Sequence, residues 1–545
     1  MDQAPLVIGV DVGTGSVRAG IFDASGRMLA SASEPIRIWK PKPDYAEQSS
    51  EDIWRATGVA IRASLEEAEV PPSRVAGISF DATCSLVVLD GEGRPLPVND
   101  EGVAERNVIV WMDHRALEET DAINADAHEV LKYVGGRLSP EMETPKLKWL
   151  KAHLPDTWAR AGKFLDLADF LTYRASGVDA RSLCTVVCKW TYLGHEGRWD
   201  RDFFSAVGLD DLFEGDKVVD DVRPMGTPLG PLTPASAEEL GLTPSCVVGV
   251  GMIDAHAGGL GLLGAVWEGK SERRLEDLEH ALALIGGTSN CHMAVSRDPK
   301  FIPGIWGPYF GAMVPQMWLT EGGQSTAGSA IDHIIADHAN APALFAQARQ
   351  AGSTVYEILN QEVERIQREQ GRGPEITRDL HILPYFLGNR SPKADAHARA
   401  VIEGMSLDES ITSQALRYYA VVQAVAYGTR DIIQEMNRAG YRIERMYVTG
   451  GGTKNPLWLQ EHADITGCTI ILPQEPEAVL LGSAILAATA CGIYPDIYAA
   501  MQGMCHSGAT IHPRTHTAAY HAAKFEVFQD LYQRQVEHRR RMQGF

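Results

Sequence analysis

The hydrophobic pattern of the first 33 residues predicts an antiparallel β-meander. Apolar residues 6–10 predict a buried strand, which ends in the turn-forming cluster 11–16. Residues 17–22 and 27–33 predict two further strands, and the segment 23–26 carries the turn signal between them. The first corner of this meander is therefore a loop rich in Gly, Thr and Ser.

The next segment alternates helix and strand. Ser50 opens an amphipathic helix whose apolar positions include Ile53, Trp54 and Leu65. Residues 75–80 then predict another buried strand, which ends at Asp81. A strand, a helix and a strand in succession indicate an α/β architecture.

The opening pattern returns in the second half of the chain. Residues 282–290 run from an apolar strand into Gly, Thr and Ser, and residues 290–295 resume as a strand. A third glycine corner, 450–453, follows the strand 445–449. Two similar halves predict a duplicated lobe with a cleft between the copies. We expect the polar run 268–279 near the lobe junction, where it can also be a solvated helix.

Composition and charge narrow the class of protein. The 545 residues are 45% hydrophobic and 22% charged, which excludes disordered and collagen-like chains and leaves room for about three to four domain-sized units. Fifty Lys and Arg against 71 Asp and Glu give a net charge of −21. A chain this acidic is a poor partner for nucleic acid or an anionic membrane, although backbone N–H groups can still hold a small anion.

Targeting signals and cysteines favour a cytoplasmic protein. The start of the chain has no basic and apolar leader, and the apolar stretch 247–266 contains Asp254 and His256, so it fails as a membrane span. The eight cysteines show no zinc-type spacing, and reduced thiols are the default. Cys184 and Cys188 can share a helical face or lie in a strand pair; we assign them no function.

Three features carry candidate chemistry. The glycine corners let backbone N–H groups converge on phosphate, and we expect these corners, rather than a P-loop or a dinucleotide-binding loop, to hold phosphates. Asp11 ends the first strand, where it can hold Mg²⁺ or cap its own turn. Asp254, between a strand and a small-residue helix, fits a general base or a helix N-cap. We interpret His256 beside it as a structural hydrogen-bonding residue.

The chain resembles FGGY-family carbohydrate kinases, a branch of the actin/hexokinase/Hsp70-like ATPase fold, over essentially its whole length. The matching segments are 11–18, 145–150, 251–258, 286–289, 321–328, 450–455 and 477–484. The pattern departs from the family at Glu143, where many members carry a small or hydroxyl residue. The resemblance implies an α/β fold of two ribonuclease H-like lobes, residues 1–265 and 280–545, with an interlobe cleft.

Within this family the closest likeness is to ribulokinases, because segments 80–86, 111–115 and 253–258 resemble that branch. The resemblance implies ATP and Mg²⁺ as cofactors and phosphorylation of a pentulose, D-ribulose at O5. L-ribulose, D-xylulose, ribitol and glycerol remain alternative substrates, and an actin-like ATPase without a sugar is the alternative of another class. The resemblance also implies a homodimer, which is the usual oligomeric state in the family.

The same resemblance assigns roles to individual residues. Asp254 is the implied catalytic base and Asp11 the implied metal ligand. The implied sugar-binding residues are Ala82, Trp111, Asp113, Lys189, Asp254 and Glu321. The implied ATP-binding residues are Gly13, Thr14, Gly15, Ser16, Gly287, Thr288, Ser289, Gln324, Gly450, Gly451, Gly452 and Asn455.

Overall fold

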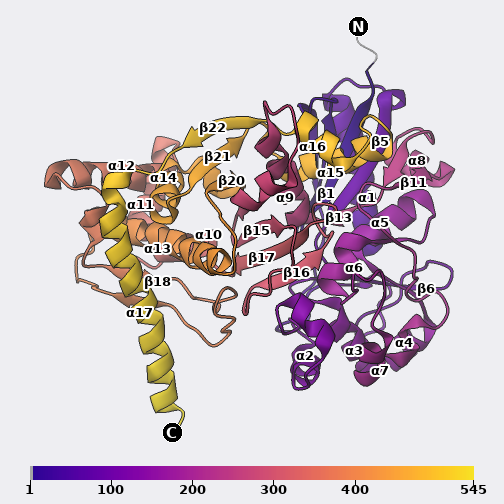
Figure 1. The fold of residues 1–545 in the computed structure, drawn as a ribbon, viewed down its shortest axis with the longest axis horizontal. Coiled ribbons are helices and arrows are strands. Elements are labelled where there is room, and N and C mark those ends of the chain that lie inside the picture. The colour runs from indigo at the N-terminus through magenta and orange to yellow at the C-terminus, as the bar shows by residue number, and fades with distance from the viewer. Residues whose placement is uncertain (1–3, 545) are drawn as a thin grey trace.

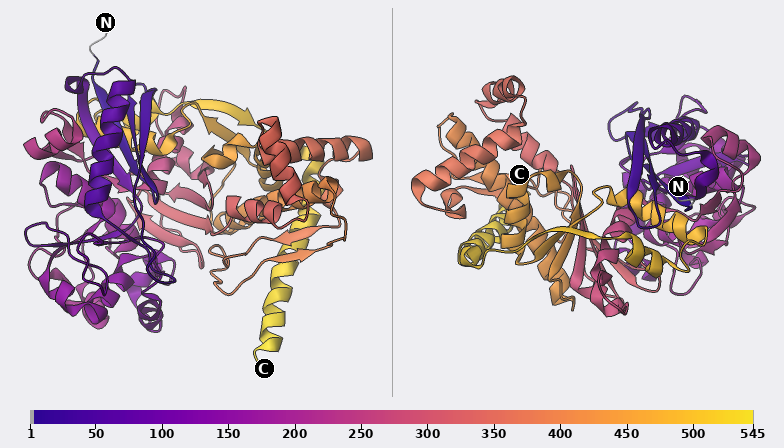
Figure 2. Two further views of the ribbon diagram at one scale, coloured as in Figure 1. Left: turned by 180° about the vertical axis from the view of Figure 1, so that it is seen from behind. Right: turned by 90° about the horizontal axis from the view of Figure 1, so that it is seen from above.

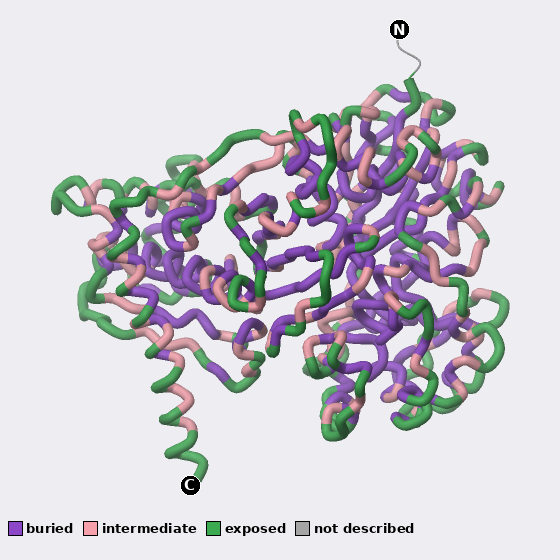
Figure 3. The backbone as a smooth tube through the Cα atoms, in the orientation of Figure 1, coloured by how far each residue is buried: buried purple, intermediate pink, exposed green. Residues whose placement is uncertain are grey.

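Two mixed β-sheets form the centres of two lobes that lie side by side (Figure 1). The computed structural model describes residues 4–544. The backbone is buried along the central strands and the helices between the sheets, and exposed in loops and at the carboxyl-terminal helix (Figure 3). None of the helices in this described part is both long and apolar enough to cross a membrane.

The sheet of the first lobe contains the predicted meander as strands β1, β2 and β3. In sheet order its path is β11 Pro228–Pro231, β12 Val247–Gly249, β5 Val75–Ala82, β1 Leu6–Val12, β2 Ser16–Phe22 and β3 Met28–Pro35, with β13 Met252–Ile253 beside the end of β5. Strands β1, β2 and β3 are antiparallel, whereas β5 runs parallel to β1. Strand β1 is buried on both faces because helices cover the sheet from both sides.

The sheet of the second lobe repeats this arrangement. Its order is β16 Trp306–Phe310, β17 Trp318–Gln324, β15 Asn290–Ser296, β14 Ala281–Gly286, β20 Arg445–Thr449, β21 Thr469–Pro473 and β22 Ser507–Ile511. Strands β14, β15 and β17 form the antiparallel meander, and β20 runs parallel to β14 as β5 does to β1. The duplicated pattern that the sequence predicts is therefore confirmed.

The remaining elements extend the two lobes. A smaller sheet of the first lobe contains β4 Glu47–Gln48, β7 Val108–Ile109, β6 Leu86–Asp90 and β8 Ala161–Asp166. The principal helices of the first lobe are α1 Ser50–Glu67, α2 Leu117–Asn124, α3 Glu143–His153, α5 Leu167–Ser176, α6 Leu183–Lys189 and α8 Pro234–Leu240. The second lobe adds α10 Gly328–Ala336, α11 Ala341–Ala351, α12 Val355–Gln370, α13 Ile411–Arg438, α14 Pro456–Thr466 and α17 Ala518–Met542. Helix α17 extends away from that lobe (Figure 2).

The local predictions agree with these elements. Helix α1 begins at Ser50, as the sequence predicts, and the Ser49 side chain caps it by accepting a hydrogen bond from the N–H of Asp52. The polar run 268–279 is a loop followed by a short 3₁₀ helix, Leu275–His280. The carbonyl of Lys270 accepts a hydrogen bond from the Gln502 side chain of α16 (Ile497–Met504), so this run lies at the junction.

The two lobes exchange helices. Helix α15 (Ala478–Ala490), from the second half of the chain, packs on β1 and β5 of the first sheet. Helix α9 (Asp254–Leu263), from the first half, packs on β14 and β20 of the second sheet. The two helices also pack against each other (Figure 1). The division into residues 1–265 and 280–545 stays a prediction, and residues 478–504 lie with the first lobe.

Glycines permit the contact between α9 and α15. A Cβ atom on Gly482 of α15 would lie 2.0 Å from the carbonyl oxygen of Ala257. A Cβ atom on Gly261 of α9 would lie 2.1 Å from the carbonyl oxygen of Ala478. Each helix thus presses backbone against backbone, and a methyl group at either position must push the helices apart.

We expect Gly482→Ala to reduce the free energy of unfolding by about 1–3 kcal/mol, the usual cost of overpacking a close contact. Denaturant titration followed by circular dichroism measures the change. Gly91→Ala is the matched control, because a Cβ there meets no atom within 4 Å. Equal stability of the two variants would show that the helices can separate without cost.

Candidate active site

A cleft of about 780 Å³ opens between the lobes. Residues of both lobes line it, from the β1–β2 corner, the β14–β15 corner, the segment 449–454 and the first turn of α9. One end carries glycine-rich turns. The other end carries charged side chains from α6, β17 and the loop around Arg390.

The glycine corners of the two lobes are each closed by a backbone hydrogen bond from the first glycine, and the loop of the second lobe is one residue shorter. The N–H of Gly13 donates to the carbonyl of Ser16 at 3.0 Å, and the N–H of Gly287 donates to that of Ser289 at 2.9 Å. A Cβ on Gly13 or Gly287 would meet only the far side of its own turn, at 3.6 Å. The cleft-facing side of each corner is therefore open to the close approach of a phosphate-sized group.

The third corner is packed against the second. Gly450 has a φ of +96°, and a Cβ there would lie 2.2 Å from the carbonyl oxygen of Gly286. Only glycine fits this position without strain. The contact brings strands β14 and β20 together at the wall of the cleft, where Gly450 and Gly451 line it.

Carboxylates gather where β1, β5 and α9 meet. Asp11 lies opposite Asp81 in the parallel register of β1 and β5, and Asp254 begins α9. Burial and the neighbouring Asp11 raise the pKa of Asp81 well above its usual range. Burial, again with a contribution from Asp11, raises the pKa of Asp254 to about 6. A carboxylate with such a pKa can exchange a proton near neutral pH.

Asp254 is not the N-cap of α9. The N-cap position is Ile253, and among the described residues the Asp254 carboxylate accepts only the N–H of the next residue, Ala255, at 2.7 Å. A capping side chain would instead accept from an N–H two or three residues further along the helix. Asp254 lines the cleft, so its carboxylate is available to a bound molecule.

Arg18 joins the two halves of the chain at this end. Its guanidinium binds the carboxylate of Asp11, with one hydrogen bond of 2.9 Å, and reaches Glu477 from the second half of the chain at 2.5 Å. Both carboxylates line the cleft beside the glycine corners. The position of Arg18 therefore depends on the segment that leads into α15.

The opposite end of the cleft has a charged constellation centred on Glu321. The carboxylate oxygens of Glu321 lie 3.1 Å from His256 Nε2 and 3.1 Å from a guanidinium nitrogen of Arg390. Burial alone would raise the pKa of Glu321, but the hydrogen bond from His256 and the charges of Arg390 and Lys189 lower it to about 2. Glu321 is therefore ionised at neutral pH.

Lys189 is a further cation at this end of the cleft. Its ammonium group lies 4.6 Å from the centre of the Trp306 ring and makes no hydrogen bond or ion pair within residues 4–544. Arg390 stacks on the same ring at 3.8 Å. Because Lys189 faces the cleft from an otherwise buried position, a bound polar molecule would satisfy its donors.

The structure brings most of the predicted site residues into this one cleft. Trp111 lies beside the first glycine corner, since the indole Nε1–H donates to the hydroxyl of Thr14 at 2.9 Å. The predicted residues that line the cleft are Asp11, Gly13, Thr14, Trp111, Lys189, Asp254, Gly287, Thr288, Ser289, Glu321, Gly450 and Gly451. Their binding roles stay predictions.

Asp113 lies elsewhere than we expected. It is fully buried, and its carboxylate accepts hydrogen bonds from the Arg115 guanidinium at 2.8 and 2.9 Å and from the N–H of Ala46 at 2.6 Å. The guanidinium of Arg115 also reaches Glu47 at 2.9 Å. The segment 111–115 thus supplies Trp111 to the cleft, while its Asp113 and Arg115 form a buried ion pair.

Six other predicted residues are not among the described residues that line the cleft: Ala82, Gly15, Ser16, Gln324, Gly452 and Asn455. The side-chain amide of Gln324 accepts a hydrogen bond from Asn290 and donates one to the carbonyl of Val425 on α13. Asn455 caps α14 by accepting from two of its first N–H groups. These polar side chains hold the walls of the cleft in place.

Several lining residues were not predicted as site residues. Arg18 stands in the segment 11–18 that resembles a phosphate loop, so its position was available as a signal. Arg390 and Glu141 come from loops with no local pattern. One indirect signal for Arg390 is Gly323, because a Cβ there would meet the Arg390 side chain at 2.8 Å.

Two stretches match the letters of nucleotide-binding motifs without their structural context. Residues 259–264 fit G-x-G-x-x-G, and residues 264–271 fit G-x-x-x-x-G-K-S. Both motifs require a loop between a strand and a helix. Here the first lies mainly within α9, and a Cβ on Gly264 would lie 2.3 Å from the carbonyl oxygen of Met501 in α16. Neither stretch lines the cleft.

Comparisons with known proteins agree with this fold. The N-terminal domain model of the FGGY family of carbohydrate kinases matches residues 6–261, and the C-terminal domain model matches residues 282–491. The chain belongs to the FGGY family of carbohydrate kinases.

Individual relatives span nearly the same length. An FGGY carbohydrate kinase domain-containing protein of Homo sapiens is 46% identical over 542 residues, covering 97% of each chain. A D-ribulokinase of Saccharomyces cerevisiae is 39% identical over 521 residues, covering 90% of this chain and 72% of its own. The crystal structure of a xylulose kinase from Rhodospirillum rubrum superposes with a TM-score of 0.77 at 21% identity, covering 97% of this chain and 98% of that one.

We expect Asp113→Asn to lower stability by about 3 kcal/mol, because it leaves the buried Arg115 with one carboxylate partner instead of two. The KM for the sugar should stay unchanged, since the side chain does not line the cleft. Denaturant titration and steady-state kinetics measure the two effects. A raised sugar KM at unchanged stability would return Asp113 to the binding site.

Proposed function

We propose that this carbohydrate kinase transfers the terminal phosphoryl group of ATP to a primary hydroxyl of an open-chain pentulose, D-ribulose at O5. The observation that carries the proposal is the position of Asp254 between two different halves of one cleft. On one side lie the paired glycine corners, and on the other lie Lys189 and Glu321. The likeness to a D-ribulokinase supports the choice of sugar.

The glycine corners fit the phosphates of ATP. The corners at Gly13 and Gly287 line the cleft from the two lobes, and the hydroxyls of Thr14, Thr288 and Ser289 line it beside them as hydrogen-bond donors. The adenosine would rest against Gly450 and Gly451. Since phosphoryl transfer asks mainly for positioning and charge stabilisation, such donors suit the reaction.

The carboxylates beside these corners fit Mg²⁺. Asp11 lines the cleft, and Asp81 directly behind it has one buried oxygen without a hydrogen-bond partner among the described residues. Mg²⁺ prefers such oxygen ligands and keeps several waters, so Asp11 would hold it, directly or through water. A bound Mg²⁺ would neutralise charge on the phosphates.

Asp254 would act on the sugar hydroxyl. Its carboxylate accepts the proton of O5 as that oxygen bonds to the γ-phosphorus, while the bond between the γ-phosphorus and the bridging oxygen breaks and ADP leaves. Lys189 and Glu321 would hydrogen-bond the other hydroxyls of the sugar. A cleft between two lobes suits an enzyme that closes on both substrates and excludes water.

An ATPase of the actin type is the alternative from another class. Such a protein needs the glycine corners but has no use for an ammonium group with free donors at the far end of the cleft. ATP turnover with and without sugar separates the two functions. A kinase is stimulated strongly by its sugar, whereas an ATPase without a sugar substrate is not.

We expect Asp254→Asn to lower kcat by about 10²–10⁴-fold and to leave nucleotide affinity nearly unchanged, because the amide keeps the shape but accepts no proton. The wild-type kcat/KM should fall as the pH drops through about 6, where Asp254 becomes protonated, and the variant should lose this step. Kinetics and calorimetry with ATP test both. A variant within about threefold of wild type would remove Asp254 from the chemistry.

We expect kcat/KM for D-ribulose to exceed that for D-xylulose, L-ribulose, ribitol and glycerol by tenfold or more, about 1.4 kcal/mol of transition-state discrimination. A site that hydrogen-bonds hydroxyls rejects an epimer by leaving buried groups unpaired. Glu321→Ala should shrink this preference more than it weakens ATP binding. A different best substrate would overturn the choice of sugar, and no stimulation by any sugar or polyol would favour the ATPase.

A further inference from the structure

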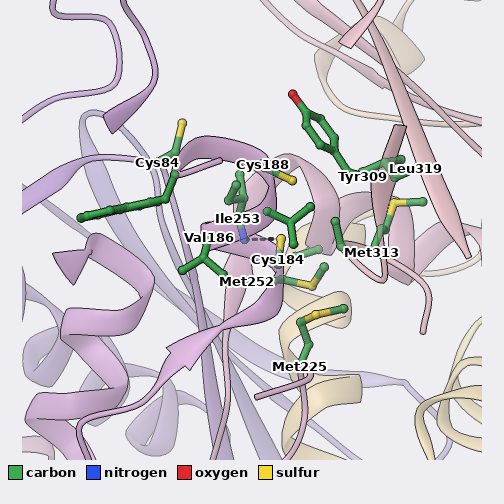
Figure 4. Packing of buried hydrophobic residues seen from close by; sticks show 14 of the residues in the cluster. Cys84, Cys184, Val186, Cys188, Met225, Met252, Ile253, Tyr309, Met313 and Leu319 are labelled. Carbon is green, nitrogen blue, oxygen red and sulfur yellow. Dashed lines mark hydrogen bonds between the residues drawn. The ribbon is translucent and has the colours of Figure 1, made fainter. Parts of the chain in front are cut away.

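Two cysteines and a histidine converge below the sugar end of the cleft. Cys184 and Cys188 are four residues apart on α6, so both sulfurs lie on one side of that helix (Figure 4). His256, from the first turn of α9, lies with its Nδ1 at 3.2 Å from Cys184 Sγ and 4.0 Å from Cys188 Sγ. The two sulfurs and one ring nitrogen lie within 4.8 Å of one another.

The surroundings of these three residues match those of a metal site. His256 turns its other nitrogen, Nε2, to the Glu321 carboxylate at 3.1 Å. A metal-binding histidine commonly donates that second N–H to a carboxylate, which leaves the first nitrogen free to bind the ion. The backbone N–H of Ile253 also points to Cys184 Sγ at 3.5 Å, where it would stabilise a sulfur that carries negative charge.

The spacing of the ligand atoms suits a small tetrahedral ion. With Zn–S near 2.3 Å and Zn–N near 2.0–2.1 Å, tetrahedral geometry places sulfur and nitrogen about 3.6 Å apart. The two observed distances, 3.2 and 4.0 Å, lie on either side of that value. Shifts of a few tenths of an ångström would therefore complete a three-ligand site.

We propose that Cys184, Cys188 and His256 bind a thiophilic divalent cation of the Zn²⁺ type, and that this ion inhibits the kinase. Thiolate and imidazole ligands select such ions over Mg²⁺, whose oxygen ligands lie at the other end of the cleft. The sulfurs are buried among apolar side chains that include Met252 and Met313 (Figure 4). His256 lines the cleft, so the ion enters through the sugar end when no sugar occupies it.

Inhibition follows from the neighbours of the three ligands. Lys189 directly follows Cys188, Asp254 precedes His256 by two residues, and Glu321 holds the imidazole. An ion that draws Cys188 toward His256 shifts Lys189. The positive charge of the ion also competes with Lys189 and Arg390 for the negative charge of Glu321. Bound metal and bound sugar therefore exclude each other, and this part of the proposal rests on the proposed function.

The binding test does not depend on activity. Reduced, metal-free full-length protein is titrated with Cd²⁺ as the probe, and the sulfur-to-metal charge-transfer absorption in the ultraviolet is followed. We expect the band to saturate at one equivalent and to be lost in Cys184→Ala and Cys188→Ala. Cys468→Ala, at a buried thiol of the second lobe, and Cys84→Ala, at a thiol that lines the cleft, are the controls and should keep it.

The inhibition test uses Zn²⁺ at a fixed excess of Mg-ATP. We expect D-ribulose to protect the wild type, a chelator to restore turnover, and Cys188→Ser to need at least about tenfold more Zn²⁺ for the same inhibition. Thermal melting confirms that each variant is folded, and Cys188→Ser carries both tests if Cys184→Ala does not fold. Because the cadmium band needs no turnover, its presence in an inactive protein would reject the proposed function and keep the metal site.

Four results would overturn the metal site. One is a cadmium band that persists in both Cys184→Ala and Cys188→Ala, and another is a band that Cys84→Ala removes. The third is zinc inhibition of equal strength in wild type and Cys188→Ser, which would place the ion elsewhere in the cleft. Recovery with a phosphine reductant but not with a chelator would indicate oxidation of the thiols and would overturn it as well.

Discussion

The close contact between helices α9 and α15 is the constraint on which the rest of the structure depends. Gly261 and Gly482 let each helix press against the backbone of the other, and each helix also packs on the sheet of the opposite lobe. The first turn of α9 carries Asp254, and Glu477 stands directly before α15. This single contact therefore sets where the candidate base lies relative to Arg18, the glycine corners and the sugar end of the cleft.

Two carboxylates in the same cleft acquire opposite properties from their surroundings. Burial, together with the nearby charge of Asp11, raises the pKa of Asp254 to about 6. Glu321 receives a hydrogen bond from His256 and faces Arg390 and Lys189, so its pKa is lowered to about 2. One is suited to accept a proton and the other to hold a fixed negative charge, which is how one site divides roles between similar groups.

His256 connects the candidate base to the rest of the cleft. It follows Asp254 on the first turn of α9 and spans the gap between Cys184 and Glu321. A group that binds Nδ1 changes the charge of the His256 ring, and this ring is a hydrogen-bond partner of Glu321. The hydrogen-bonding role that the sequence suggests for this residue is confirmed, and the contact with the cysteines adds the proposed metal-binding role to it.

Patterns between neighbouring residues determined much of this protein by sequence alone. The meander of β1 to β3, its copy in β14 and β15, and the glycine corners depend on local hydrophobicity and on turn residues, and Asp11 and Asp254 follow from their places at the ends of strands. Only the tertiary structure decided which polar side chains face the cleft. Asp113 and Gln324 were predicted there, but buried partners, Arg115 and the α13 carbonyl of Val425, use their hydrogen bonds. The contact of Arg390 with Glu321 and that of Cys184 with His256 each join residues about 70 positions apart in the chain. No local sequence pattern encodes such contacts.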